Sequence, residues 1–145
     1  MIRILVIACG NPLRADDAVA WHIAEALEDA NNDPTIRVRT VQQLTPELAE
    51  EISHAETVVF VDAAESDNPG AVTLEALQPM PAAPSRFTHS VHPAALLGLA
   101  RDLCGRAPDR AFLLTVAGSS FEFSEALSAP VAQAVPEAVR RIRSI

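Results

Sequence analysis

The sequence is most constrained near its start, where a continuous apolar run ends abruptly in a polar loop. Residues 4–8 (Ile-Leu-Val-Ile-Ala) are all apolar, and Gly10-Asn11-Pro12 follows after Cys9. A run this short and continuous is typical of a parallel strand buried on both faces, and Pro12 lacks the N–H donor needed to extend it. Two adjacent acids, Asp16 and Asp17, stand where the next helix begins. In open α/β sheets, binding sites lie at this end of the strands.

Strand and helix patterns alternate along the rest of the chain. Strands are expected over 2–8, 36–41, 57–62, 72–77 and 111–117, and helices over about 17–30, 45–53, 93–104 and from 128 or 129 to 143. Thr45 is expected to be the N-cap of the second helix, with Pro46 as its first residue. Pro136 is expected to kink or restart the last helix. Asp67-Asn68-Pro69-Gly70 reads as a turn, and the strand after it is the one that can run antiparallel.

This alternation predicts an α/β fold with one domain over residues 1–145. We expect a three-layer sandwich in which helices cover both faces of a twisted, mostly parallel five-stranded sheet, as in the phosphorylase/hydrolase-like folds. The stretch from Pro79 to Phe87 holds three prolines and is expected to be an irregular loop. Loops of this kind often flank sites.

Composition and charge exclude several classes of protein. The 145 residues include 11 basic and 19 acidic side chains, which gives a net charge of −8 with neutral histidines. An acidic chain repels phosphate backbones, so a nucleic-acid partner is not expected. The sequence contains no apolar stretch of the roughly 20 residues needed to span a membrane and no secretory leader pattern at its start. Cys9 and Cys104 form no disulfide framework. We therefore expect a soluble cytoplasmic protein.

Two later segments can bring further chemistry to the sheet edge where Asp16 and Asp17 lie. Asp62 directly follows a buried-strand run, and His89 and His92 come just before the helix that starts at Pro93. A set of two aspartates and one histidine suits zinc or nickel with open coordination positions. The sequence therefore predicts a metal site, with either histidine as the imidazole ligand.

Each of these residues also has a structural interpretation. Asp16 and Asp17 can cap the following helix and interact with its dipole, or one can cap while the other faces the cleft. Asp62 can cap a loop at the end of its strand. Cys9 can be a nucleophile activated by a histidine, although a cysteine at this position is more often a small core residue. Four other residues are assigned no chemical role, namely His22, His54, Ser119 and Ser120.

Three short segments occur here in an order and spacing that are typical of one enzyme family. They are Gly10-Asn11-x-Leu13-x-x-Asp16-Asp17, the strand end Val59-Phe60-Val61-Asp62-Ala63, and Thr88-His89-Ser90-Val91 before an aliphatic helix. On these segments the chain resembles the nickel–iron hydrogenase maturation endopeptidases, over nearly its whole length.

Two features depart from the family pattern. Ala18 and Ala20 stand where the family often has glycine after the acidic pair. Many members carry an Asp-Gly-Gly-Thr stretch after the second strand, whereas Gln42-Gln43-Leu44-Thr45 stands here and looks like a variant of one branch. The second departure concerns substrate selection more than the metal site.

The resemblance implies both an activity and the residues that carry it. It implies a hydrolase, an endopeptidase that removes the C-terminal extension of a nickel-loaded hydrogenase large-subunit precursor during maturation. Asp17, Asp62 and His89 then stand at the catalytic and metal-binding positions, and His92 is a helix-start residue or supports the ligands. The resemblance further implies that the precursor carries the nickel. In the isolated protein, zinc or cadmium can take the place of nickel. The enzyme is expected to be a monomer.

Two other functions fit parts of the sequence. A non-catalytic module that binds a nickel-loaded metalloenzyme precursor, as a chaperone does, would use the same residues without cutting the partner. Peptidyl-tRNA hydrolases also have a glycine-asparagine-proline loop after their first strand. They need a basic surface that faces tRNA and a histidine early in the chain, and this acidic sequence offers neither convincingly.

Overall fold

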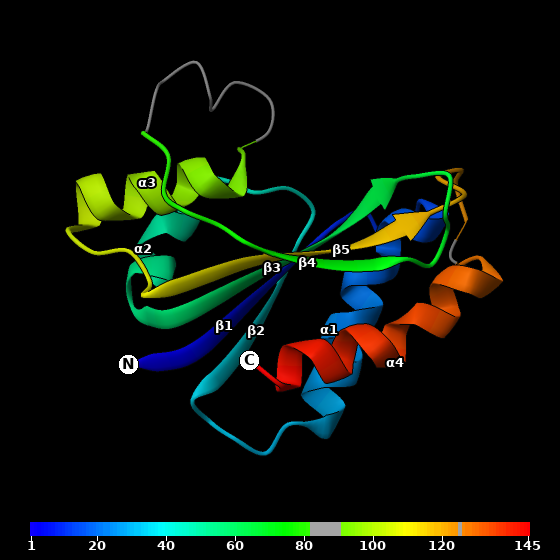
Figure 1. Cartoon of the computed structure of the whole chain (residues 1–145), viewed down its shortest axis with the longest axis horizontal. Helices are drawn as coiled ribbons and strands as arrows, with labels where there is room; N and C mark the ends of the chain where they lie inside the picture. The colour runs from blue at the N-terminus through cyan, green and yellow to red at the C-terminus, as the bar shows by residue number, and fades with distance from the viewer. Residues whose placement is uncertain (82–90, 125) are drawn as a thin grey trace.

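The apolar runs of the sequence form one five-stranded sheet with helices on both faces (Figure 1). The computed structural model describes residues 1–81, 91–124 and 126–145. The strands are β1 (Ile2–Cys9), β2 (Ile36–Val41), β3 (Ala55–Glu65), β4 (Val72–Ala76) and β5 (Arg110–Gly118). The helices are the 3-10 turn η1 (Ala15–Ala18), α1 (Val19–Ala30), α2 (Leu48–Ser53), α3 (Pro93–Cys104) and α4 (Ala129–Arg143). The predicted fold class is confirmed.

The strand order is β2-β1-β3-β5-β4, and β4 alone of these strands runs antiparallel to its neighbour. The strand after the turn at 67–70 is therefore antiparallel, as predicted. β1 and β3 occupy the centre, which explains why their sequences are continuous apolar runs. The ladder between β3 and β5 continues to the pair Glu65–Gly118, whereas the ladder between β1 and β3 ends at the pair Ala8–Val61. Asp62 is thus the first residue of β3 beyond its ladder with β1, while it is still paired with β5.

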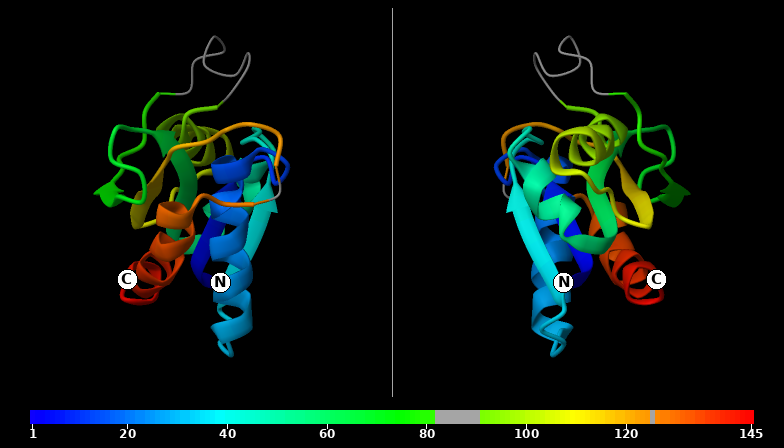
Figure 2. Two further views of the ribbon diagram at one scale, coloured as in Figure 1. Left: turned by 90° about the vertical axis from the view of Figure 1, so that its right-hand side faces the viewer. Right: turned by 90° about the vertical axis from the view of Figure 1, so that its left-hand side faces the viewer.

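The two faces of the sheet bury two separate apolar cores. On one face, Ile4 and Val6 of β1 pack with apolar residues of α1 and α4, which lie side by side in Figures 1 and 2. On the other face, Leu5 and Ile7 pack with Phe60 and with α2 and α3. Successive side chains of a strand point to opposite faces, so Cys9 and Asp62 continue the rows of Ile7 and Phe60 toward the side of α3.

Two helices start later than the sequence predicts. The residues before α2 form a turn, with hydrogen bonds from Leu48 N to Thr45 O and from Ala49 N to Pro46 O. Glu47 is the N-cap and makes no side-chain capping bond, so the prediction of Thr45 as the N-cap was wrong. The predicted start of the first helix at 17 lies instead in the separate turn η1.

The last helix continues through Pro136 and does not restart. A proline removes the hydrogen bond to the carbonyl four residues earlier, here that of Ala132. Both residues are exposed, so water can bind the freed carbonyl, and α4 keeps its buried face. Of the irregular loop predicted over 79–87, residues 82–87 lie outside the described residues.

None of the helices in the described part of the chain is both long and apolar enough to cross a membrane.

The core on the side of α3 offers a matched test of the packing. Leu97 is 1% exposed and Leu103, on the same helix, is 76% exposed. We expect Leu97→Ala to lower the free energy of unfolding by about 2–5 kcal/mol, because it leaves a cavity between α3 and the sheet. Leu103→Ala should change it by less than about 0.5 kcal/mol. Urea unfolding followed by circular dichroism measures both, and equal effects would contradict this packing.

Candidate functional site

A pocket of about 410 Å³ opens at the carboxyl edge of the sheet, where β1 ends beside β3. It contains four of the residues singled out from the sequence, namely Cys9, Asp17, Asp62 and His92. The other residues that line it are Gly10, Gln42, Gln43, Leu44, Phe60, Val61, Val91, Pro93 and Leu113. His89 lies outside the described residues, so its role as a ligand stays a prediction.

The glycine-asparagine pair after β1 positions Asp17. A methyl group added at Gly10 would overlap the carbonyl oxygen of Asp17, so only glycine lets η1 approach the end of the strand this closely. The next residue, Asn11, donates its backbone N–H to Asp17 Oδ2 at 2.8 Å. Ala15, which opens η1, has a φ of +44°, a left-handed conformation that costs an alanine about 1 kcal/mol or more. The loop therefore holds the Asp17 carboxylate in one place at the mouth of the pocket.

Asp62 has a carboxyl group that gains a proton much more readily than a free aspartate. Burial raises its pKa, the N–H of Ala63 at 2.8 Å lowers it, and the negative charge of Asp17 raises it further, to about 6 overall. Two carboxyl groups in one pocket repel each other when both are ionised. A cation between them would remove this repulsion, so the donor chemistry of the pocket fits a metal ion.

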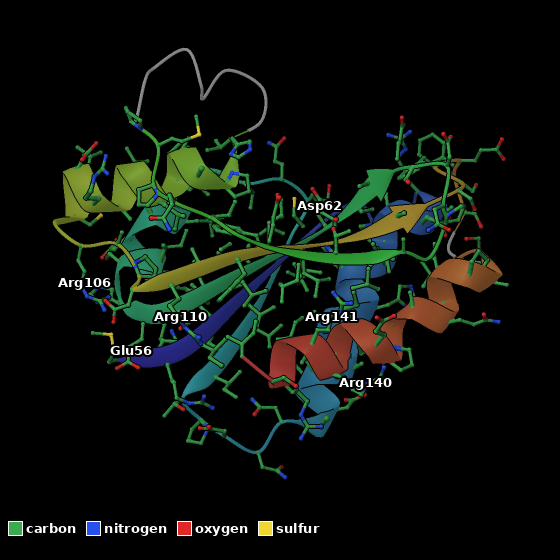
Figure 3. All side chains as sticks on the ribbon, viewed as in Figure 1. Glu56, Asp62, Arg106, Arg110, Arg140 and Arg141 are labelled. Carbon is green, nitrogen blue, oxygen red and sulfur yellow. The ribbon has the colours of Figure 1, made fainter. Side chains whose placement is uncertain are left out.

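Within the described part of the chain, no arginine side chain lies among these acids in the pocket. Among the described residues that line the pocket, none is an arginine or a lysine. Figure 3 shows Arg106 and Arg110 at the opposite end of the sheet from Asp62, and Arg140 and Arg141 on α4. The pocket is therefore acidic although arginines are available elsewhere in the chain.

Cys9 lies in the same pocket but is poorly suited to nucleophilic attack. Burial, followed by the charges of Asp62 and Asp17, raises the pKa of its thiol to about 12. Its Sγ lies 3.7 Å from the carbonyl oxygen of Gln42. The reactive form of cysteine is the thiolate, so this environment argues against the thiol nucleophile considered from the sequence.

His92 is the N-cap of α3 and accepts a hydrogen bond from the N–H of Ala94 at Nδ1, at 3.1 Å. A neutral imidazole that accepts at Nδ1 carries its proton on Nε2. It then has no free lone pair for a metal while it caps the helix. This geometry favours the helix-start interpretation of His92 over its role as the alternative ligand.

The described residues do not form a complete metal site. Within residues 1–81, 91–124 and 126–145, no three His, Cys, Asp or Glu side chains group closely enough to hold a metal ion. Among the described residues, Asp17 and Asp62 are therefore too few to hold a metal ion by themselves.

Asp16 has a structural role that the sequence analysis missed. Its side chain is fully buried and accepts five hydrogen bonds, from the N–H and hydroxyl groups of Ser119 and Ser128 and from the N–H of Ser120, at 2.7–3.2 Å. Neither Asp16 nor Asp17 caps a helix through its side chain, so that interpretation was wrong. Burial would raise the pKa of Asp16, but these donors lower it below its usual value.

Gly118 makes room for this arrangement at the end of β5. A methyl group added there would lie 2.8 Å from Phe121 Cζ and 2.9 Å from Asp16 Cβ. Through these hydrogen bonds, Asp16 holds Ser119, Ser120 and Ser128 against η1. Asp16 directly precedes Asp17, which lines the pocket. Serines spread over ten positions give no local sequence pattern from which this contact could be inferred.

A larger pocket of about 650 Å³ lies at the opposite edge of the sheet. Residues at its rim include Arg3 and Arg143, with Ile4, Leu27 and Ile142 also lining it. None of the predicted site residues lies there, and Arg3 is already paired with Asp33 at 2.8 Å. The smaller pocket is therefore the better candidate for the site.

We expect Asp16→Asn to destabilise the fold by at least about 2 kcal/mol, because it removes a buried charge that is fully hydrogen-bonded and turns an amide NH₂ toward N–H donors. The folded pKa of Asp16 is lowered, so its contribution is complete above the unfolded pKa of about 4 and is lost as the pH falls further. The difference from the parent protein should therefore shrink between pH 7 and pH 3 in urea unfolding. Asp29→Asn, at an exposed position of α1, is the control for the change in charge.

Comparisons with known proteins bear on the fold. No family model and no curated protein matches the sequence. The chain is similar to the solved structure of the hydrogenase maturating endopeptidase HybD from E. coli, with a TM-score of 0.78 and 24% identity over 98% of this chain and 90% of that one. It is also similar to the [NiFe] hydrogenase maturation protease HycI from Thermococcus kodakarensis KOD1, with a TM-score of 0.76 and 20% identity over 99% and 91%. The hydrogenase 2 maturation peptidase from Thaumarchaeota archaeon SCGC_AB-539-E09 gives a TM-score of 0.73 and 24% identity over 98% and 96%. The chain therefore has the fold of solved hydrogenase maturation endopeptidases.

Proposed function

We propose that this protein is an endopeptidase that removes the C-terminal extension of a nickel-loaded hydrogenase large-subunit precursor. The observation that carries the proposal is the presence of Asp17 and Asp62 in one acidic pocket at the carboxyl edge of the sheet. The fold is shared along nearly the whole chain with structures described as hydrogenase maturation peptidases, and this supports the choice of activity.

In this proposal, the two aspartates recognise the nickel that the precursor carries. Asp17 is held by Gly10 and Asn11, so its carboxylate needs little reorganisation when the cation arrives. Asp62 and Asp17 repel each other in the empty pocket, and contact with a cation relieves this repulsion. His89 is proposed as the third protein ligand, while His92 caps α3.

The bound precursor then places its scissile peptide bond beside the nickel. A metal ion in this position can polarise the peptide carbonyl or activate the attacking water. In this proposal a carboxylate of the pocket accepts a proton from the attacking water and returns it to the leaving amine. The pocket thus supplies ligands, orientation and proton transfer, and the substrate brings the metal.

The activity is tested by mixing the protein with its nickel-loaded precursor and following the loss of the extension by gel mobility or intact mass. We expect Asp17→Asn and Asp62→Asn each to slow cleavage at least about 100-fold, and a precursor without nickel to stay uncut. His89→Ala should have a similar effect and His92→Ala a much smaller one.

Asp29→Asn, which makes the same change in charge on exposed α1, should cleave normally. If the parent protein binds the loaded precursor but never cuts it, the non-catalytic binding module is the better assignment.

The isolated protein should bind zinc or cadmium weakly through the same pocket. We expect Asp17→Asn or Asp62→Asn to lower the association constant at least about tenfold, because each removes an ionic oxygen ligand. Isothermal titration calorimetry measures the binding, with Asp67→Asn as a control for general acidity. Unchanged affinity in both pocket variants would show that the cation binds elsewhere.

A further inference from the structure

Two large apolar side chains stand exposed on the paired segments next to η1. Phe123 is 84% and Leu13 is 53% exposed to solvent. Among the described residues, the other strongly exposed large hydrophobic side chains are Met1, at the chain end, and Leu103 on α3. Clustered exposed apolar side chains mark interaction sites more often than single ones do.

The backbone brings Leu13 and Phe123 next to each other. Arg14 and Ser124 form a parallel bridge, in which Ser124 N donates to Leu13 O at 2.9 Å and Ala15 N donates to Ser124 O at 2.8 Å. Leu13 and Phe123 each precede one partner of the bridge, so the two exposed residues are neighbours across it.

Further hydrogen bonds connect the loop of Leu13 to the candidate pocket. Asn11 donates its N–H to Asp17 Oδ2 at 2.8 Å and accepts the N–H of Leu13 at its side-chain oxygen, at 2.9 Å. Across the bridge, Arg14 Nε donates to the carbonyl of Phe121 at 3.1 Å. The loop that carries Leu13 is therefore tied to the carboxylate of Asp17, which lines the pocket.

We propose that Leu13 and Phe123 form an apolar docking surface that binds an apolar segment of the hydrogenase large-subunit precursor and guides its extension to Asp17 and Asp62. This inference rests on the proposed function. We call the pair Leu13–Phe123 the apolar lip. In this proposal the precursor is held outside the pocket as well as at the scissile bond, and the apolar lip adjoins the loop whose hydrogen bonds reach Asp17.

The size of the apolar lip favours a substrate over a second copy of this chain. A phenylalanine buries at most about 150–250 Å² in a contact, and the leucine adds less. A stable interface buries roughly 800 Å² on each partner. Two side chains are too few to hold a dimer, but they suffice as an anchor for a partner that the pocket also binds.

The test compares the cleavage of nickel-loaded precursor by the parent protein, Leu13→Ser, Phe123→Ser and the double variant. Leu103→Ser, which removes a still more exposed leucine from α3, is the control. We expect KM to rise roughly tenfold in each single variant and further in the double variant, with kcat nearly constant, because the lip binds substrate and transition state alike. Leu103→Ser should match the parent.

A binding measurement separates this inference from the proposed function. In the background Asp17→Asn, which prevents cleavage, biolayer interferometry with immobilised precursor should show weaker binding when Phe123→Ser is added. Normal cleavage with unchanged KM in both lip variants would overturn the docking role and leave the peptidase intact. No cleavage by the parent would overturn the peptidase, and the interferometry would then decide on the lip alone. A parent dimer that Phe123→Ser dissociates in sedimentation velocity would assign the lip to a second copy.

Discussion

The buried carboxylate of Asp16 is the interaction on which the arrangement of the site depends. It joins η1 to the segment that begins after β5, and the chain separates the two by about a hundred residues: Ser119 N donates to Asp16 Oδ2 at 2.8 Å and Ser128 N to Asp16 Oδ1 at 2.7 Å. Hydrogen bonds to a charged acceptor are stronger than those between neutral groups, and burial protects them from water. Without this anchor, nothing else in the described hydrogen-bond network would hold the Ser119–Ser120 turn against η1 through side chains.

Two glycines complete the anchor by allowing close approach. Gly10 admits the backbone of Asp17 to the end of β1, and Gly118 admits Asp16 and Phe121 to the end of β5. Gly10 directly follows β1 and Gly118 is the last residue of β5, and each of these strands has a paired neighbour on both sides. The loops at this edge are therefore irregular in conformation and yet fixed to the sheet. Rigid placement of this kind is what a site needs if its carboxylates are to meet a cation without large reorganisation.

The sequence predicts the fold well because its signals are local. Apolar runs such as residues 4–8 and the proline start of α3 at Pro93 need no knowledge of the rest of the chain. The pocket was also predictable in part, since the loop before Asp17 and the acid after the apolar run of β3 can both be found in the sequence. The predicted strand end at Asp62 was wrong, because β3 continues to Glu65 and Asp62 lies within it. The structural role of Asp16 was not predictable, because its hydrogen-bond partners are distant serines that form no sequence pattern. Thr45 failed as an N-cap because a turn, unpredictable from capping preferences, precedes α2.

The adjacent residues Asp16 and Asp17 have different roles, one in the fold and one in the pocket. In a 3-10 turn, consecutive side chains point about 120° apart, so Asp16 can reach the serines while Asp17 lines the pocket. Hydrogen bonds lower the pKa of Asp16, and its ionisation therefore stabilises the fold. The charge of Asp17 instead helps to raise the pKa values of Asp62 and Cys9, which makes the ionised pocket a cost to stability. The N–H groups of Ala63 and Asn11 offset only part of this cost, and contact with a cation, as the proposed function requires, would offset more.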